Sequence, residues 1–146
     1  LTTATPLVAN TLYTISSGNI TDCSGNLITA GFESKTAVIA LSATTGDILI
    51  NEILFNPKSG GVRFVELYNN STNFINLKNW LLTGGESDRE ISTEESIIAP
   101  GEYLVLTTDI AILANQYPAS QLANAIQMTS FPSLPNAEGR DFSAKL

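Results

Sequence analysis

The chain has 146 residues, of which 43% are hydrophobic and 14% are charged, and its formal net charge is −7. This length suits one domain, or one domain and a fragment, and it allows a hydrophobic core without disulfide staples. The acidic balance makes nucleic acids and anionic membranes poor partners, because both repel a negative protein. No apolar run approaches the length of a transmembrane helix, so membrane insertion is not expected.

The residue inventory argues against an enzyme. The sequence has no histidine, which removes Ser-His-Asp and Cys-His arrangements and every histidine-ligated metal site. Its single cysteine, Cys23, excludes an internal disulfide and a CxxC metal site. We therefore predict no catalytic residue, no cofactor-binding residue and no cofactor.

The first 42 residues contain short strand signals separated by turn formers. An apolar run at residues 12–15 predicts a strand, and residues 18–26 are rich in Gly, Asn, Asp and Ser, which favour turns. Two further short strands are expected at residues 27–28 and 36–41. Residues 42–46 have the composition of a linker.

The clearest strand signals lie between residues 46 and 85. Branched and aromatic residues predict strands at 48–55 and 63–68, each closed by Asn- or Gly-rich turn chemistry. Residues 74–82 predict one kinked strand or two short ones, which end at Gly84-Gly85. Strands at this spacing indicate an all-β sandwich or barrel.

Shorter elements follow the acidic run at residues 86–95, for which a solvated connector is the expected structure. Strands are expected at residues 97–98, at 102–107 and, more weakly supported, at 123–128. Thr108-Asp109 predicts a helix N-cap, because apolar residues follow at helical spacing. The apolar residues of that helical face are Ile110, Ile112, Leu113 and Tyr117.

Five motifs in the correct order resemble the lamin tail domain family, over about residues 46–139. They are Ile50-Asn51-Glu52-Ile53, Phe64-Val65-Glu66-Leu67-Tyr68-Asn69, Leu77-Lys78-Asn79-Trp80-Leu81-Leu82, Pro100-Gly101-Glu102-Tyr103-Leu104-Val105-Leu106 and Phe131-Pro132-Ser133-Leu134-Pro135-Asn136. The resemblance implies an all-β fold, an immunoglobulin-like β-sandwich with one short helix. It also implies a secreted or cell-surface bacterial protein, since the rod of a lamin is absent.

The pattern Y-T-I-S-x-G-x-I-T-D-x-x-G-N at residues 13–26 resembles the final strands of bacterial Ig-like domains. We therefore expect residues 1–42 to be the C-terminal fragment of such a domain plus a linker, in which the partner of Cys23 would lie in the missing part. Residues 43–146 are expected to form the lamin-tail-like domain. Residues 136–146 do not look like the closing hairpin of that family, so either closing strands are missing or this member departs from the pattern.

Several residues have both a functional and a structural interpretation. Glu52 and Glu66 in adjacent strands could serve acid–base chemistry, but scaffold residues on a polar sheet face are the preferred interpretation. Trp80 could stack on sugars, although a lone Trp between leucines usually belongs to a core. Tyr13, Tyr68, Tyr103 and Tyr117 are dispersed, and no aromatic strip is evident.

Calcium is the metal for which the sequence offers oxygen ligands. The candidates are less favoured than a plain turn and a solvated connector, and no metal site is predicted. They are Asp22, Asn26, Glu86, Asp88, Glu90, Glu94 and Glu95.

The sequence predicts a non-catalytic interaction or scaffold module of a secreted or surface multidomain protein, with a protein or an extracellular polymer as partner. Plentiful Thr, Ser, Asn and Ala fit an extracellular β protein. The alternatives are an accessory module that binds a glycan or another polymer beside a hydrolase, and a calcium-stabilised adhesion module. The third class is a hydrolase whose chemistry is carried by Glu52 and Glu66, and it is the least favoured because the residue inventory is so thin. An exposed aromatic row would favour the glycan alternative, and two carboxylates about 5–10 Å apart in an open cleft would favour the hydrolase.

Overall fold

The computed structural model describes residues 4–15, 20–27, 35–84, 87–132 and 142–145. The chain divides into two compact units, Leu1–Leu41 and Ser42–Leu146, and this boundary lies one residue from the expected one. In the described ranges, no helix combines the length and the apolar character that crossing a membrane requires.

The first unit contains a two-stranded antiparallel ribbon. Strand β1 (Leu12–Ile15) pairs with β2 (Lys35–Val38), and Leu12 lies opposite Val38. Strand β1 has the predicted bounds, whereas β2 is shorter than the predicted run at residues 36–41. The predicted strand at residues 27–28 is reduced to an isolated bridge between Thr21 and Leu27, and residue 28 lies outside the described residues.

The second unit contains the remaining elements. They are β3 (Ile48–Leu54), β4 (Phe64–Asn69), β5 (Ile75–Asn76), β6 (Leu81–Gly84), β7 (Ser87–Glu90), β8 (Ile97–Ile98), β9 (Tyr103–Thr107), α1 (Ile110–Gln116), β10 (Ile126–Gln127) and β11 (Phe142–Lys145). Strands β3, β4, β8 and β9 lie where the sequence predicts them. The predicted run at residues 74–82 forms the two short strands β5 and β6.

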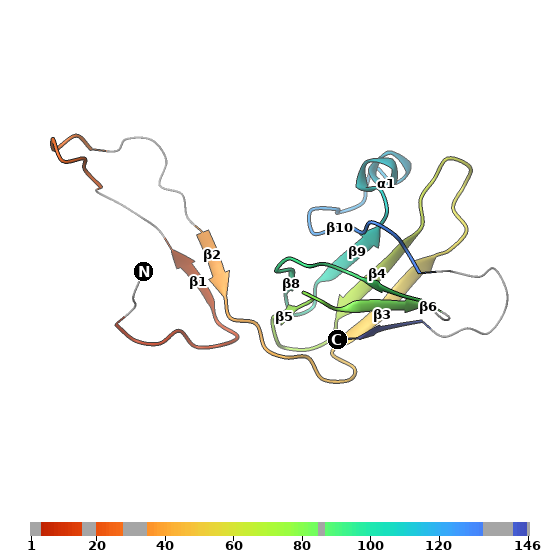
Figure 1. Ribbon diagram of the computed structural model, residues 1–146, viewed down its shortest axis with the longest axis horizontal. Helices are drawn as coiled ribbons and strands as arrows, with labels where there is room; N and C mark the ends of the chain where they lie inside the picture. Colours follow the sequence, from red (N-terminus) through yellow and green to blue (C-terminus); the bar gives the residue numbers. More distant parts are fainter. Residues whose placement is uncertain (1–3, 16–19, 28–34, 85–86, 133–141, 146) are drawn as a thin grey trace. The chain divides into compact units, whose positions relative to one another are not determined.

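These strands form an immunoglobulin-like β-sandwich with one short helix, which confirms the predicted fold class. One sheet has the order β10-β9-β4-β3, a second has the order β11-β6-β7, and β5 pairs with β8 in a separate ribbon. Figure 1 shows the strands of the second unit stacked in layers, with α1 just beyond the end of β9. Strand β10 runs parallel to β9, so the chain must cross over between them, and α1 forms part of that crossover.

The core of the second unit consists of inward-facing apolar side chains from these layers. They are Val65, Leu67, Ile75, Leu77, Trp80, Leu82, Ile91, Ile98, Leu104, Leu106 and Met128. Trp80 is 7% exposed, which confirms that it belongs to the interior. Along β4, buried and half-buried residues alternate, as they do in a strand between a core and a solvated face.

A β-bulge in β3 explains the Ile-Asn-Glu-Ile motif at residues 50–53. The register with β4 shifts between Ile50 and Glu52, so Asn51 is the additional residue. Ile50 and Ile53 therefore both pack against the core although they are three positions apart. The side chain of Asn51 donates to Glu66, with 2.7 Å between Nδ2 and Oε1.

The acidic run is the clearest correction to the sequence-based prediction. Residues 87–90 form strand β7, which pairs antiparallel with β6, and they are not a solvated connector. Half-buried and exposed residues alternate along this strand, and Ile91 at its end is buried in the core. Charged residues suit an edge strand because they discourage pairing with another chain. Because the strand is rich in charged residues, its composition resembles that of a solvated loop, which is why the sequence predicted a connector.

Two further corrections concern the end of the chain. The predicted strand at residues 123–128 is limited to β10, because residues 122–125 form a turn in which Ala125 N–H donates to the Leu122 carbonyl at 3.0 Å. Residues 142–145, which were not expected to close the fold, form β11 and pair antiparallel with β6. Their local sequence has few of the usual strand signals, so this pairing depends on the neighbouring strand.

Asn69 at the end of β4 is a fully buried polar side chain. Its Nδ2 donates to the carbonyls of Asn73 at 2.7 Å and Ile98 at 3.0 Å. Its Oδ1 accepts from the backbone N–H of Ser71 at 3.0 Å and from the Ser71 hydroxyl at 2.7 Å. Both ends of the side chain are therefore satisfied, which burial of an amide requires.

We predict that Asn69→Ala lowers the free energy of unfolding by about 2–4 kcal/mol, because it leaves buried carbonyl and N–H groups without partners. Urea denaturation followed by tryptophan fluorescence measures this loss. The matched control is Asn70→Ala, since Asn70 is exposed and should change stability by less than about 0.5 kcal/mol. A loss below about 1 kcal/mol for Asn69→Ala would show that the network is dispensable.

Candidate functional site

The outer face of the four-stranded sheet carries aromatic and acidic side chains in cross-strand rows. Tyr68 on β4 lies opposite Tyr103 on β9, and their ring centroids are 4.7 Å apart with a tilt of 33°. The next row along the strands places Glu52, Glu66 and Val105 side by side. These side chains point away from the core because they alternate with buried neighbours.

A groove of about 660 Å³ lies over this face. Its floor comes from β3, β4 and β9, one wall comes from α1 and the segment after it, and one end is the turn before β9. The lining residues are Glu52, Phe64, Glu66, Gly101, Glu102, Tyr103, Val105, Leu113, Tyr117, Ser120, Gln121, Leu122, Ala123 and Asn124. Volumes of this size are typical of ligand sites.

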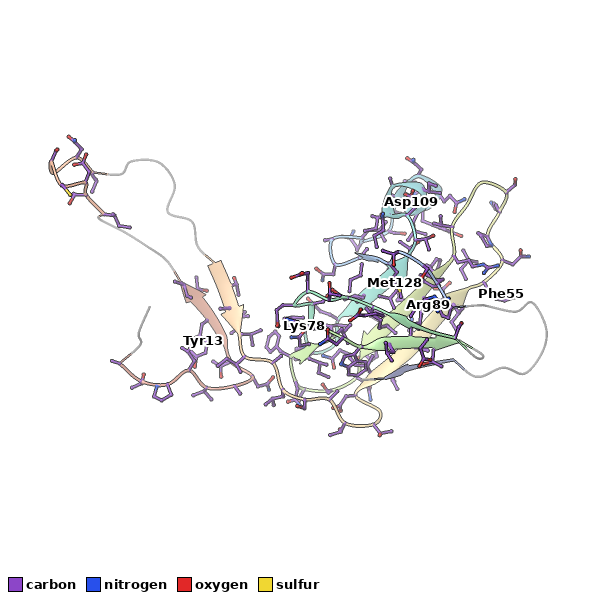
Figure 2. The ribbon with its side chains drawn as sticks, in the orientation of Figure 1. Tyr13, Phe55, Lys78, Arg89, Asp109 and Met128 are labelled. Carbon is purple, nitrogen blue, oxygen red and sulfur yellow. The ribbon has the colours of Figure 1, made fainter. Side chains whose placement is uncertain are left out.

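The helical wall of the groove is held by the predicted N-cap. The Asp109 carboxylate accepts the backbone N–H of Ile112 at 2.9 Å, which confirms the capping role, and Figure 2 shows Asp109 at the start of α1. Leu113 is buried, and Tyr117 at the C-cap is 41% exposed. The ring of Tyr117 meets Phe64 of β4 edge to face, with centroids 6.1 Å apart. The helix is thereby joined to the outer face of the sheet.

The end of the groove depends on a tight turn at residues 99–102. Gly101 has φ +71, and the N–H of Glu102 donates to the carbonyl of Ala99 at 3.1 Å. Pro followed by Gly with a positive φ is the pattern of a type II turn. The Glu102 carboxylate folds back to accept the N–H of Ala99 at 3.3 Å and the side-chain amide of Asn124 at 3.5 Å.

The groove is acidic and has no cationic side chain in its described lining. Glu52, Glu66 and Glu102 contribute carboxylates, and neither lysine nor arginine lies among the described lining residues. Glu52 and Glu66 lie directly opposite each other on neighbouring strands, where like charges repel. Glu66 accepts one hydrogen bond from Asn51. Within the described ranges, no hydrogen bond or ion pair from the protein reaches the Glu52 carboxylate.

This arrangement offers two kinds of contact to a ligand. Exposed aromatic rings offer flat apolar surfaces, and the carboxylates accept hydrogen bonds or face a cation. Histidine, cysteine and lysine are absent from the described lining, in which Glu52 and Glu66 are directly opposed carboxylates. The scaffold interpretation of Glu52 and Glu66 was incomplete, because both side chains line the groove.

Sequence analysis missed the aromatic part of the site. Tyr68, Tyr103 and Tyr117 looked dispersed, but the β4–β9 register stacks the first two, and α1 brings the third to Phe64. One signal was available in Phe64-Val65-Glu66-Leu67-Tyr68. Its alternation places Phe64, Glu66 and Tyr68 on a single face.

The calcium candidates are spread over several elements. Both oxygens of the Asp22 carboxylate accept hydrogen bonds within a turn, from the N–H of Ser24 at 2.9 Å and from the N–H and side-chain amide of Asn26 at 2.8 Å each. Glu95 pairs with Lys78 at 3.3 Å and also accepts from the side-chain amide of Asn76. Glu86 lies outside the described residues.

The other candidates lie in or after β7. Asp88 and Glu90 belong to that edge strand, and Glu94 is exposed in the loop after it. In the described part of the chain, no three residues of the Asp, Glu, His and Cys types are grouped so that they could hold a metal ion. Where these residues lie does not by itself test whether the chain binds calcium.

The fold is an immunoglobulin-like β-sandwich whose four-stranded sheet carries an acidic and aromatic groove on its outer face. The Lamin Tail Domain family matches residues 42–141, which is more than half of the chain, and the chain belongs to that family. The match confirms the resemblance assigned to residues 46–139. The chain matches no curated protein and no solved structure significantly.

We predict that calcium leaves the thermal midpoint of the chain unchanged within about 1 °C, because the Asp22 and Glu95 carboxylates already accept protein donors. Scanning calorimetry with millimolar CaCl₂ and with chelator tests this expectation. The control is MgCl₂ at equal concentration, which corrects for general screening of an acidic protein. A rise of several degrees with calcium alone would establish a metal site.

The turn at Asp22 also predicts a pH effect. The pKa of Asp22 lies below its ordinary value, mainly because the side-chain amide of Asn26 donates to it, with backbone N–H groups adding to the effect. Because the folded-state pKa is lowered, these hydrogen bonds stabilise the turn fully at pH values above the ordinary pKa of aspartate. Their contribution is lost as the pH falls through the folded-state value.

We therefore predict that Asn26→Ala raises the pKa of Asp22 toward its ordinary value, because the largest stabilising donor is removed while the backbone donors remain. NMR titration of the Asp22 side-chain carboxyl carbon measures it. Ser24→Ala is the matched control, since Ser24 donates through its backbone N–H and should leave the pKa unchanged. An unchanged pKa in Asn26→Ala would refute the assigned cause.

Proposed function

We propose that this chain is a non-catalytic recognition module of a secreted or cell-surface multidomain protein of the bacterial type. It binds a protein or an extracellular polymer through the groove on the outer face of β3, β4 and β9. Membership of the lamin tail domain family supports an interaction or scaffold role, because the family is immunoglobulin-like and non-catalytic. The abundance of Thr, Ser, Asn and Ala supports an extracellular location.

The observation that carries this proposal is the exposure of aromatic residues around the groove. Tyr103 is 51% exposed and Tyr117 is 41% exposed, whereas Trp80, the largest aromatic side chain, is buried in the core. A spacer needs a stable core, and the packing of Tyr117 on Phe64 serves that need, but the large exposed part of the Tyr103 side chain beside a cavity does not. Clusters of exposed apolar surface around a concavity mark binding sites.

A second candidate is a glycan-binding accessory module beside a hydrolase. The exposed faces of Tyr103 and Tyr117 favour it, because sugar rings stack on such faces and carboxylates such as Glu102 accept hydroxyl donors. This candidate uses the same groove. It therefore differs from the first candidate in the ligand and not in the binding site.

We predict that Tyr103→Ala combined with Tyr117→Ala weakens ligand binding by at least about tenfold, because it removes the two exposed aromatic contacts of the groove. The measurement is binding of the full chain to arrays of peptides and of oligosaccharides. Hits are then titrated by calorimetry. Unfolding is recorded for each variant to establish that the fold persists.

Phe55→Ala is the matched control, since Phe55 is 47% exposed yet does not line the groove. Figure 2 shows Phe55 where β3 runs into the loop toward β4. Ligands that bind the double tyrosine variant as tightly as the parent chain would place recognition elsewhere and refute the proposal. Turnover of any array ligand would refute its non-catalytic part.

A further inference from the structure

The charge distribution of the groove selects a ligand class. The chain as a whole carries 14 acidic and 7 basic residues, and the described lining of the groove contains Glu52, Glu66 and Glu102 but no lysine or arginine. Glu52 and Glu66 face each other across neighbouring strands, an arrangement that repels when nothing is bound. A cation between them converts this repulsion into attraction, whereas a neutral hydroxyl group does not.

The aromatic walls suit the same class of ligand. Phe64, Tyr103 and Tyr117 flank the carboxylates, and aromatic faces attract ammonium and guanidinium groups through their quadrupoles. Val105 on the floor is half-buried and provides an apolar surface for the methylene stem of a long side chain. Lysine and arginine combine such a stem with a terminal charge.

The geometry of the strands favours an extended segment. Two cross-strand rows bound this part of the sheet, one pairing Phe64 with Thr107 and the other pairing Tyr68 with Tyr103. They are four positions apart on β4. At the usual rise of a strand this is roughly 13 Å, the length of about four residues of extended peptide. The carboxylates of Glu52 and Glu66 come from the row between them.

We infer that the groove binds a lysine or arginine side chain presented by an extended basic segment of a protein partner. The cationic group lies between Glu52 and Glu66, and the stem packs against Tyr103, Val105 and Tyr117. This inference rests on the proposed function, because it names the ligand class of the same groove. Charge complementarity selects the basic peptide over the neutral glycan.

The test is a titration of the full ¹⁵N-labelled chain followed by amide shifts in NMR. The probes are an alternating lysine–serine hexapeptide, the corresponding glutamate–serine hexapeptide, and cellohexaose as a neutral glycan. We expect only the lysine peptide to shift the amides of β3, β4, β9 and α1. Its affinity should fall as ionic strength rises from low to physiological.

The decisive variant is Glu52→Gln with Glu66→Gln. Glutamine keeps the shape and the acceptor that Asn51 uses, and the loss of like charges does not threaten the fold. We expect affinity for the lysine peptide to fall by at least about tenfold. The matched control is Glu90→Gln with Glu94→Gln, which removes two exposed charges outside the groove and should cost less than about twofold.

Each other outcome overturns the inference. If the two double variants lose affinity for the lysine peptide equally, the peptide responds only to the net charge of the chain and does not bind at the Glu52–Glu66 pair. Groove shifts with cellohexaose but not with the lysine peptide would replace the basic segment by a glycan and leave the proposed function standing. If neither the lysine peptide nor cellohexaose shifts the amide signals of the groove, the inferred cationic ligand is wrong. The array experiment with the tyrosine variants then tests the proposed function independently.

Discussion

The second unit depends on the hydrogen bonds around Asn69. Its side chain holds the loop after β4 and the end of β8. Its backbone N–H donates to the backbone carbonyl of Glu102 at 3.0 Å, and its own carbonyl accepts from the N–H of Gly101 at 2.9 Å. The two backbone hydrogen bonds hold the turn before β9 against the end of β4, and the side-chain bond to the Ile98 carbonyl holds the residue just before that turn. That turn sets where Glu102 and Tyr103 begin the strand, so the position of the groove follows from a residue in the interior.

The two faces of the four-stranded sheet perform different tasks. The inner face packs branched side chains against β6 and its neighbours, and it determines stability. The outer face carries the stacked pair Tyr68 and Tyr103, the Phe64 ring on which Tyr117 packs, and the opposed carboxylates of the groove. The bulge at Asn51 connects the two tasks, because it keeps Ile50 and Ile53 in the core while it places Glu52 opposite Glu66. A repulsive pair is tolerated where a stable core offsets its cost.

Much of the fold was predictable because the relevant signals are local. Alternation over residues 64–69, the Asn-rich turn after them and the Asp109 cap each act within a few residues of the chain. The acidic strand β7 and the closing strand β11 were not predictable. Their local composition is that of a connector, and pairing with β6 overrides it.

The sequence by itself determined that this is a β-sandwich of the lamin tail domain family, because the order of the motifs and the alternation of apolar residues can be read directly along the chain. Only the tertiary structure decided where the groove lies. Tyr68 and Tyr103 are far apart in sequence, and only the β4–β9 register places them side by side. The crossover through α1 adds Tyr117, and the bulge adds Glu52. Each of these depends on pairing between distant strands, which no local pattern encodes.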